Sequence, residues 1–310
     1  MVTIGEGEKL MNQRIKALRA FGTAITILNI LGHTILGFEQ SLAQVFTAVF
    51  TAYLVELIIE FVDSKVNKRK PAYHGGLINK IDFLIPAHIS GLAIGMLLFA
   101  NNEVLPFAFA ASLAIVTKTI FQVNIQGKKK HFLNPSNTGI AVTLLLFPWI
   151  SIAPPYHFAE NIQDEWDIIL PLIILMLGSM LNIRLTKKGP LIIAWLGGFV
   201  IQALIRSIFT DISLIGALLP MTGMAFLLFT FYMITDPGTT PVKTSNQIIF
   251  GFSVAIVYGI LMNLHVVFTL FFSLFVVCLL RGCYHFIKSL LNHKKEKLKE
   301  CRVCAKELPL

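Results

Sequence analysis

Several charged residues lie in or beside apolar stretches of this sequence. Lys118 follows a run rich in Ala, Phe and Leu, and Glu56, Glu60 and Asp63 are spaced four and three residues apart at the end of another apolar run. On a helix this spacing puts the three carboxyl groups on one face. Because an ionisable group inside a membrane is costly unless it is paired or hydrated, we expect Lys118 to form an ion pair with Glu56 or Glu60.

Two interpretations of these charges are open at this point. Lys118, Glu56 and Glu60 are candidates for an ion or proton path through the membrane. Alternatively, the Lys118 ammonium reaches the interface along its apolar stem, and the acidic groups nearer the helix end are already hydrated. Two histidines in apolar stretches, His33 and His88, are expected to be hydrogen-bonded packing residues.

Two polar motifs interrupt other apolar stretches. Asn134-Pro-Ser-Asn137 follows a short basic run, and Thr235-Asp-Pro-Gly-Thr-Thr-Pro241 precedes Lys243. Asparagine before proline is typical of a helix N-cap with proline at the first helical position, and Asp236 before Pro237 suits a similar cap. Capping alone is therefore one explanation of both motifs.

The same atoms also suit an anion site. Amides at a helix N-terminus, with lysines nearby, bind a phosphate or the electron-rich edge of a flavin ring. We therefore predict that the two motifs lie at similar depth on one side of the membrane. The candidate cofactor-binding residues are Asn134, Asn137, Thr235, Asp236 and Thr239.

Other familiar catalytic patterns are missing from the sequence. It has no Walker A loop, no HExxH and no GxSxG, which argues against ATP-driven transport and hydrolysis. Cys301-Arg-Val-Cys304 has the spacing of half a zinc site, which His285 and His293 or a second subunit would have to complete. The alternative is that Cys301 and Cys304 are free thiols on a reduced cytoplasmic tail.

Composition indicates that lipid surrounds most of the chain. Hydrophobic residues make up 55% of the 310 positions and charged residues only 14%, whereas soluble domains have roughly 25% charged residues. The net charge of +9 is carried by short clusters between apolar runs, which is typical of topology signals. We therefore expect an all-α integral membrane protein in contact with the bilayer, and no nucleic-acid partner.

Ten segments are apolar and long enough to be considered as membrane spans, although some barely qualify. The weakest division separates the last two, where Met262-Asn-Leu-His265 is the only polar break. The predicted spans are residues 18–37, 42–62, 82–100, 104–124, 136–153, 167–183, 189–209, 212–234, 246–262 and 265–281.

Loop charges agree with this count. With the N-terminus in the cytoplasm, all but two of the 26 Lys and Arg residues fall on the cytoplasmic side, and acids such as Glu39 and Glu103 fall outside. Both termini are then cytoplasmic. The predicted organisation is an N-terminal segment 1–17 with an interfacial helix over 8–18, a membrane domain 18–281 and a basic tail 282–310.

A division near residue 160 gives two halves of five helices, 18–160 and 161–281. Because five is odd, the second half enters the membrane from the opposite face, as in proteins with inverted repeats. A faint sequence echo supports this: Gly91-Leu-Ala93 leading to Leu98-Phe99 matches Gly223-Met-Ala225 leading to Leu228-Phe229.

The two polar motifs carry a family resemblance. NPSNTGIAVTLLLFP (134–148) and YMITDPGTTPVKTSNQIIFG (232–251) resemble the NqrB/RnfD family, the membrane subunits of the sodium-pumping NADH:quinone oxidoreductase and of the Rnf complex. The resemblance covers roughly residues 80 to 280, and the chain looks like shortened members found among enediyne biosynthesis proteins. It implies ten helices in a bacterial inner membrane, electron transfer through flavins and coupling to ion translocation, with other membrane or redox subunits as partners.

The flavin attachment site of the family is absent. Family members bind FMN covalently through a threonine in a Ser-Gly-Ala-Thr segment after the fifth helix, whereas residues 151–166 read SIAPPYHFAENIQDEW. The resemblance therefore implies non-covalent riboflavin or FMN, if any flavin. The leading hypothesis is an electron-transport or ion-translocating subunit. The alternatives are a flavin-free small-molecule transporter or export partner, and a structural subunit that docks a partner through its tail.

Overall fold

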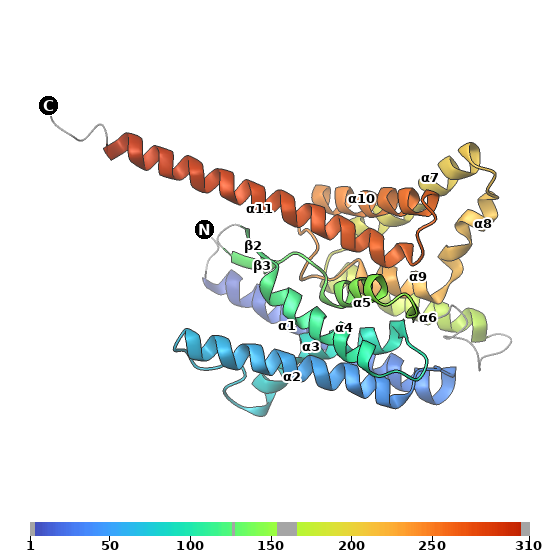
Figure 1. Ribbon diagram of the computed structural model, residues 1–310, viewed down its shortest axis with the longest axis horizontal. Coiled ribbons are helices and arrows are strands. Elements are labelled where there is room, and N and C mark those ends of the chain that lie inside the picture. Colours follow the sequence, from blue (N-terminus) through green and yellow to red (C-terminus); the bar gives the residue numbers. More distant parts are fainter. Residues whose placement is uncertain (1–3, 126–127, 154–165, 305–310) are drawn as a thin grey trace.

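The computed structural model describes residues 4–125, 128–153 and 166–304. The described part of the chain is mostly helical (Figure 1). The helices of its N-terminal part are α1 Ile4–Leu31, extended by the π-helical turn η1 Gly32–Leu36, α2 Leu42–Val66, α3 Leu77–Leu97, α4 Leu105–Ile120 and α5 Pro135–Leu146. Those that follow are α6 Trp166–Met180 with η3 Leu181–Leu185, α7 Gly189–Phe209, α8 Leu214–Leu218 with η4 Leu219–Thr222, α9 Met224–Leu228 with η5 Phe229–Met233, α10 Thr244–Asn263 and α11 Thr269–Cys304.

Strands in the described residues are confined to two short antiparallel pairs. β1 Leu98–Phe99 pairs with β4 Ser151–Ile152, so the segments after α3 and α5 lie side by side. β2 Gln122–Ile125 and β3 Lys128–His131 form a hairpin that leads from α4 to α5.

The helices form two groups (Figure 1). In the first group, α2 packs on α3 and α4, α1 packs on α3, and α4 packs on α5. In the second, α7 packs on α10, α10 packs on α11, and α6 packs on α9. Contact between α5 and α11 joins the two groups.

Small residues allow close approach inside each group. A Cβ atom on Gly91 of α3 would lie 2.7 Å from the Cα of Val49 on α2. A Cβ atom on Gly251 of α10 would lie 2.7 Å from the carbonyl oxygen of Leu191 on α7. Such backbone contact is how helices associate in lipid, where no hydrophobic force drives them together.

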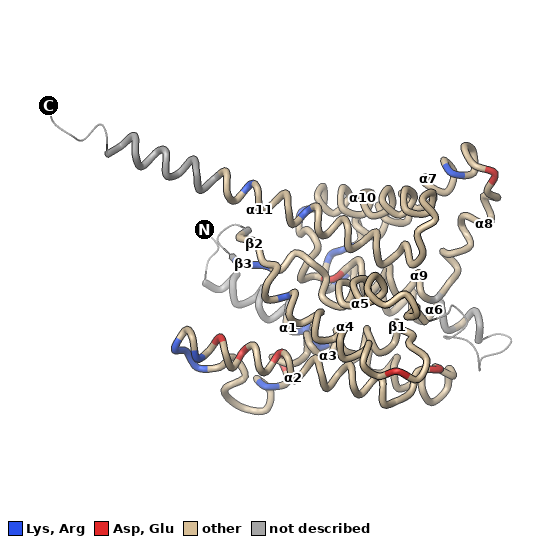
Figure 2. The backbone as a smooth tube through the Cα atoms, in the orientation of Figure 1, with Lys and Arg blue, Asp and Glu red and all other residues tan. Residues whose placement is uncertain are grey.

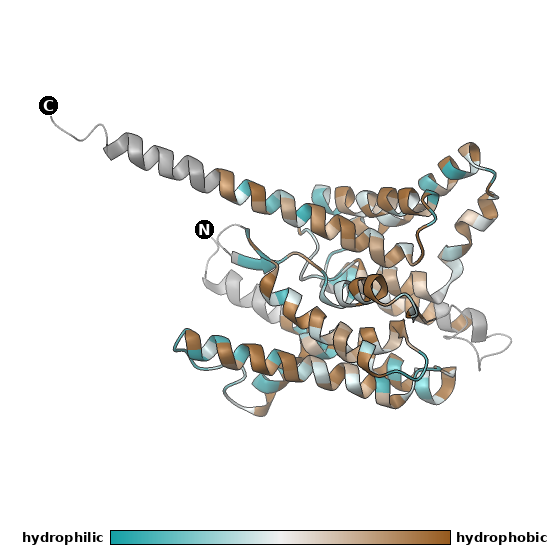
Figure 3. Ribbon diagram, in the orientation of Figure 1, coloured by the Kyte–Doolittle hydropathy of each residue, from teal (hydrophilic) through white to brown (hydrophobic). Residues whose placement is uncertain are grey.

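Six helices in the described part of the chain are long and apolar enough to cross a membrane, or seven if the bent pair formed by α8–η4 and α9–η5 is one span. Their outward faces are apolar as well. On α2, Phe46, Phe50 and Leu54 recur every four residues and are 69%, 66% and 45% exposed. Brown, hydrophobic residues cover the helices in Figure 3. An exposed apolar face of this extent fits a lipid bilayer, and the chain is a multi-pass membrane protein.

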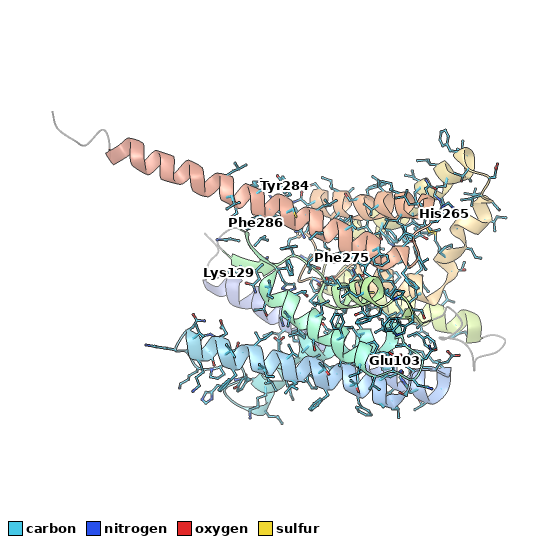
Figure 4. All side chains as sticks on the ribbon, viewed as in Figure 1. Glu103, Lys129, His265, Phe275, Tyr284 and Phe286 are labelled. Atoms are coloured by element: carbon cyan, nitrogen blue, oxygen red, sulfur yellow. The ribbon has the colours of Figure 1, made fainter. Side chains whose placement is uncertain are left out.

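Basic residues are concentrated toward one end of the helices. In Figure 2, most Lys and Arg residues that are drawn lie toward the end where α2 finishes and the β2–β3 hairpin stands, whereas acidic residues occur both on α2 near that end and at the opposite end. Lys129 and Tyr284 lie toward the basic end, and Glu103 and His265 lie toward the other (Figure 4). We call these the basic end and the acidic end.

Helical residues occur at each of the ten predicted positions, but only six of these helices, or seven with the bent pair at 212–234, are long and apolar enough to span a membrane in the described part of the chain, and several boundaries differ. The span predicted for 104–124 ends at Ile120, and the span predicted for 136–153 ends at Leu146. The predicted break between the last two spans is confirmed: α10 ends at Asn263 and α11 begins at Thr269. Leu264–Phe268 contains two left-handed residues, His265 and Phe268.

The two chain ends also differ from expectation. The segment predicted as a separate interfacial helix over 8–18 is the first part of α1. The basic tail begins inside a helix, because α11 continues through Arg281 to Cys304. The sequence echo does not mark equivalent positions, since Gly91 lies within α3 whereas Gly223 lies at the bend before α9.

Candidate functional site

The predicted ion pair of Lys118 is present. The Lys118 Nζ atom on α4 lies 2.6 Å from Oε1 and 2.7 Å from Oε2 of Glu56 on α2. The two side chains are 22% and 12% exposed. The packing of α4 on α2 therefore brings together the two residues that the sequence analysis singled out, between helices whose other faces are apolar.

Glu60 does not pair with Lys118. Its Oε2 accepts a hydrogen bond of 2.9 Å from Arg69 Nη2, and its Oε1 accepts one of 2.5 Å from the Ala72 backbone. Asp63 also accepts a hydrogen bond from Arg69. The Glu56 carboxylate is therefore paired within the helix bundle, whereas the carboxylates of Glu60 and Asp63 anchor the loop after α2. The alternative Lys118–Glu60 pair was wrong because Arg69, beyond the helix end, reaches Glu60 first.

His88 on α3 lies between two hydroxyl groups. Its Nε2 is 2.8 Å from Thr26 Oγ1 on α1, and its Nδ1 is 2.6 Å from the hydroxyl oxygen of Tyr53 on α2. Thr26 donates its proton to the Gly22 carbonyl at 2.7 Å, so it accepts from His88. The assignment that satisfies every group is Tyr53 donating to Nδ1 and Nε2–H donating to Thr26.

In this assignment the hydrogen bonds all donate in the same direction, from Tyr53 through His88 to Thr26. The chain lies one helical turn from Glu56, because Tyr53 and Glu56 are three residues apart on α2. His33, by comparison, lies 2.9 Å from the Asn29 carbonyl oxygen and 3.1 Å from that of Gln40. Both histidines are hydrogen-bonded, as predicted, but only His88 connects three helices.

The NPSN motif caps α5 and also bonds to the segment directly before the TDP motif. The Asn134 Oδ1 atom accepts a hydrogen bond of 3.0 Å from the Asn137 backbone, which confirms the predicted N-cap. Its Nδ2 donates at 3.0 Å to the Met233 carbonyl at the end of η5. Asn137 Nδ2 donates at 3.0 Å to the Phe271 carbonyl in the first turn of α11. The two amides therefore tie α5 to the second group of helices.

The TDP motif is a loop whose side chains bond to the loop itself. Asp236 Oδ1 accepts from the Gly238 backbone at 3.1 Å, and Oδ2 accepts from the Thr239 hydroxyl at 2.8 Å. Thr235 donates to the Phe231 carbonyl at 2.7 Å, and Thr240 donates to the Asp236 carbonyl at 2.6 Å. This pattern matches the capping explanation of the motif.

The five candidate cofactor residues therefore do not fit a flavin. Asn134, Asn137, Thr235 and Thr239 are at most 4% exposed, and their donors are engaged within the protein. Of their side-chain oxygens, only Asn137 Oδ1 is buried without a hydrogen-bond partner among the described residues. One buried acceptor is not enough to recognise an isoalloxazine ring, which also needs donors.

Two basic side chains, neither of which the sequence analysis selected, hold the TDP loop. The Lys188 Nζ atom donates to the Pro241 carbonyl at 2.7 Å and lies 3.4 Å from that of Thr240, and Arg281 donates to the Thr239 carbonyl. Lys188 is only 3% exposed. Burial lowers its pKa to about 8, although the nearby Asp236 opposes the shift. In the sequence, the signal available for Lys188 was its position directly before Gly189-Pro190, where α7 begins.

A second buried polar contact lies between α7 and α10 near the acidic end. Arg206 is 6% exposed and its Nε donates to Asn263 Oδ1 at 3.3 Å. Gln202, one turn earlier on α7, has no hydrogen-bond partner for either amide atom among the described residues. Arg206 was detectable from sequence, because it and Lys118 are the two basic residues that fall outside the predicted cytoplasmic segments.

The metal hypothesis concerns side chains outside those described, namely Cys301, Cys304 and His293. Within the described part of the chain, no three His, Cys, Asp or Glu residues are placed to hold a metal ion. Cys278 is buried there and Cys283 is exposed, both as free thiols.

Comparison with known proteins adds no identification. No family model matches the sequence, and no curated protein matches it. The resemblance to the NqrB/RnfD family therefore remains a prediction that depends on the two polar motifs.

Proposed function

We propose that this protein is an ion-translocating membrane subunit of NqrB/RnfD type, in a bacterial inner membrane. In this proposal it crosses the bilayer ten times, with both termini in the cytoplasm and the basic end on the cytoplasmic side. The proposal is supported by helical residues at every predicted span position and by the concentration of Lys and Arg residues toward one end of the molecule (Figure 2). The helices α4 and α5 are short for a membrane span. The segments that follow them, which lead into the β2–β3 hairpin and into β4, would complete these two crossings.

The observation that carries the proposal is the ion pair between Lys118 and Glu56. Hydrophobic side chains of similar size would fill this space at lower cost, because desolvation offsets much of the attraction between buried charges. Charged groups between membrane helices typically mark ion pathways or proton relays. A proton that binds Glu56 neutralises the carboxylate and releases Lys118, so the pair is an element with two states.

The neighbouring hydrogen bonds extend this path. The Tyr53–His88–Thr26 chain lies one turn of α2 from Glu56 and links α2, α3 and α1. Histidine and tyrosine side chains can both accept and donate protons, so Tyr53 and His88 would be the next proton-carrying groups after Glu56. The path then runs through the four helices α1 to α4.

The packing pattern also supports two inverted halves. The α2–α4 contact corresponds to α7–α10, α4–α5 corresponds to α10–α11, and α1–α3 corresponds to α6–α9. In each half, the pair α2–α4 or α7–α10 carries a polar contact, Lys118–Glu56 in one and Arg206–Asn263 in the other. Polar contacts toward opposite faces are suited to alternating access.

A flavin-free transporter for a small molecule is the second candidate. It is favoured by the NPSN and TDP side chains, whose donors are engaged by carbonyl and carboxylate oxygens of the protein itself. A non-covalent riboflavin or FMN would have to be held by other residues. Acid extraction of the purified protein separates the two candidates: bound flavin supports a redox-coupled subunit, and its absence supports the transporter.

Ion translocation itself is tested by reconstitution. Vesicles containing the wild-type protein and an internal pH-sensitive dye should take up protons when a membrane potential is imposed. Lys118→Met should reduce this uptake at least tenfold, whereas Lys80→Met, which removes an exposed lysine from α3, should not. Equal uptake by wild type and Lys118→Met, at equal protein content, would refute the proposed path.

A further inference from the structure

A large groove lies on the side of the molecule where α10 and α11 face each other near the basic end. Its floor is the TDP loop and the β2–β3 hairpin, and its volume is about 1460 Å³. This exceeds the roughly 300–1,000 Å³ of pockets for drug-sized ligands. The groove is separate from the Lys118–Glu56 path, which lies between α2 and α4.

One part of the groove is strongly cationic. Of the described side chains that line it, none is Asp or Glu, and the basic ones come from three different elements. Arg281 is fixed in place, because it bonds the Thr239 carbonyl and lies 5.9 Å from the centre of the Phe250 ring. The basic residues are Lys130 on the hairpin, Lys243 before α10, and Arg281 and Lys288 on α11.

The other part of the groove is apolar and open to the surroundings. On α10, Ile249 and Ile256 line it and are 64% and 58% exposed; on α11, Leu280 lines it and is 61% exposed. Ile249 and Ile256 are seven residues apart, so they share one helix face. A ligand with an anionic head and an apolar chain would match both parts.

The order of residues along α11 places the boundary between the cationic and the apolar part of the groove at the membrane surface. The helix is apolar up to Leu280 and then carries Arg281 and Lys288, and Tyr284 between them is typical of the interface. Basic pockets between helices on the cytoplasmic side bind anionic lipid headgroups. We propose that the groove between α10 and α11 binds an anionic phospholipid, with its phosphate among Lys130, Arg281 and Lys288 and an acyl chain along Ile249 and Ile256.

This inference is independent of the proposed function, and lipid binding tests it. The purified protein should bind phosphatidylglycerol at least tenfold more tightly than phosphatidylcholine in detergent. The double variant Lys130→Gln/Lys288→Gln should lose about tenfold or more of that affinity, because each lysine near an anionic surface contributes about 1 kcal/mol. Lys65→Gln/Lys80→Gln, which removes the same charge outside the groove, should change it less than twofold.

A second pair of variants tests the apolar part without changing charge. Ile256→Trp should fill the groove and weaken phosphatidylglycerol binding several-fold, whereas Ile260→Trp, on the same helix and 53% exposed but outside the lining, should not. Equal binding of the two lipids, or full affinity in the Lys130/Lys288 variant, would overturn the inference. Tight FMN binding that is lost in that variant, without any lipid preference, would replace it with a nucleotide site.

Discussion

The Lys118 ammonium and the Glu56 carboxylate form an ion pair between α2 and α4. Removing one partner leaves the other charge without compensation, and this costs about 3–5 kcal/mol in a fully buried pair. Here the side chains are 22% and 12% exposed, so the loss should be smaller, about 1–3 kcal/mol.

A double-mutant cycle measures this coupling. Lys118→Met and Glu56→Gln should each lower the thermal stability of the protein in detergent, and the double variant should lose less than the sum of the two. We expect an interaction free energy of about 1 kcal/mol. Strict additivity would mean that the two groups do not stabilise each other.

Lys188 should make stability depend on pH. Its pKa is about 8 in the folded protein, below the ordinary value of 10.5. Between these values the unfolded chain holds a proton that the folded protein has released, so folding becomes more favourable as pH rises from about 8 to 10.5. The melting temperature of wild type relative to Lys188→Met should therefore rise over this interval.

The control for this prediction is Lys187→Met, which removes the adjacent exposed lysine. Relative to that variant, the wild-type melting temperature should show no comparable rise. A wild-type advantage over Lys188→Met that falls as pH increases would contradict the buried, hydrogen-bonded position of the ammonium.

At this scale the sequence predicted that Lys118 pairs with Glu56 or Glu60, because an unpaired charge in lipid is costly, and that Asn134 caps a helix, because proline follows it directly. It missed His88 as a link between helices, and Lys188 and Arg281 as anchors of the TDP loop. Those roles depend on carbonyl groups that lie between 42 and 53 residues away for the two anchors, or on hydroxyls of two other helices. No short pattern encodes such contacts.

Asn134 connects two elements by two separable bonds. Its Oδ1 caps α5, and its Nδ2 joins α5 to the end of η5. Asn134→Ser keeps a good capping residue but removes the amide donor, so it should cost about 1 kcal/mol. Asn134→Ala removes both bonds and should cost about 2 kcal/mol.

Thermal unfolding of the two variants in detergent checks this order. A melting temperature for Asn134→Ser equal to that of wild type would mean that the bond to Met233 does not stabilise the junction. A loss in Asn134→Ser as large as in Asn134→Ala would mean that the cap contributes nothing.

Element boundaries show where hydropathy alone is insufficient. The segment after α4 was assigned to a helix because it is apolar on average, yet Val123 is buried while Gln122 and Asn124 are exposed, which is the alternation of a strand. The helix α5 ends at Leu146 because Phe147 precedes Pro148, and a residue before proline disfavours helical geometry. The extension of α11 was missed because its last turns are basic rather than apolar.

For the whole molecule, the basic and acidic ends define an orientation. We expect the basic end in the cytoplasm, because positively charged loops are retained on that side. In a background without the natural cysteines, Lys129→Cys should react with a membrane-impermeant thiol reagent only from the cytoplasmic side. His265→Cys should react only from the outside. Labelling of both positions from one side would contradict the inverted arrangement of the halves.

The helical class and the apolar outward surface were predictable, because lipid selects long apolar helices separated by charged loops. How the helices pair was not. The α2–α3 and α7–α10 contacts depend on glycines such as Gly91 and Gly251, which appear ordinary in the sequence and matter only when another backbone approaches them.

The most direct test of the account is the proton flux through Glu56→Gln. Glutamine keeps the size of the side chain but cannot bind and release the proton that the path requires. In vesicles with an imposed membrane potential, the wild-type protein should take up protons, and Glu56→Gln, inserted in equal amount, should show almost none. Undiminished uptake by Glu56→Gln would contradict an ion path through the Lys118–Glu56 pair.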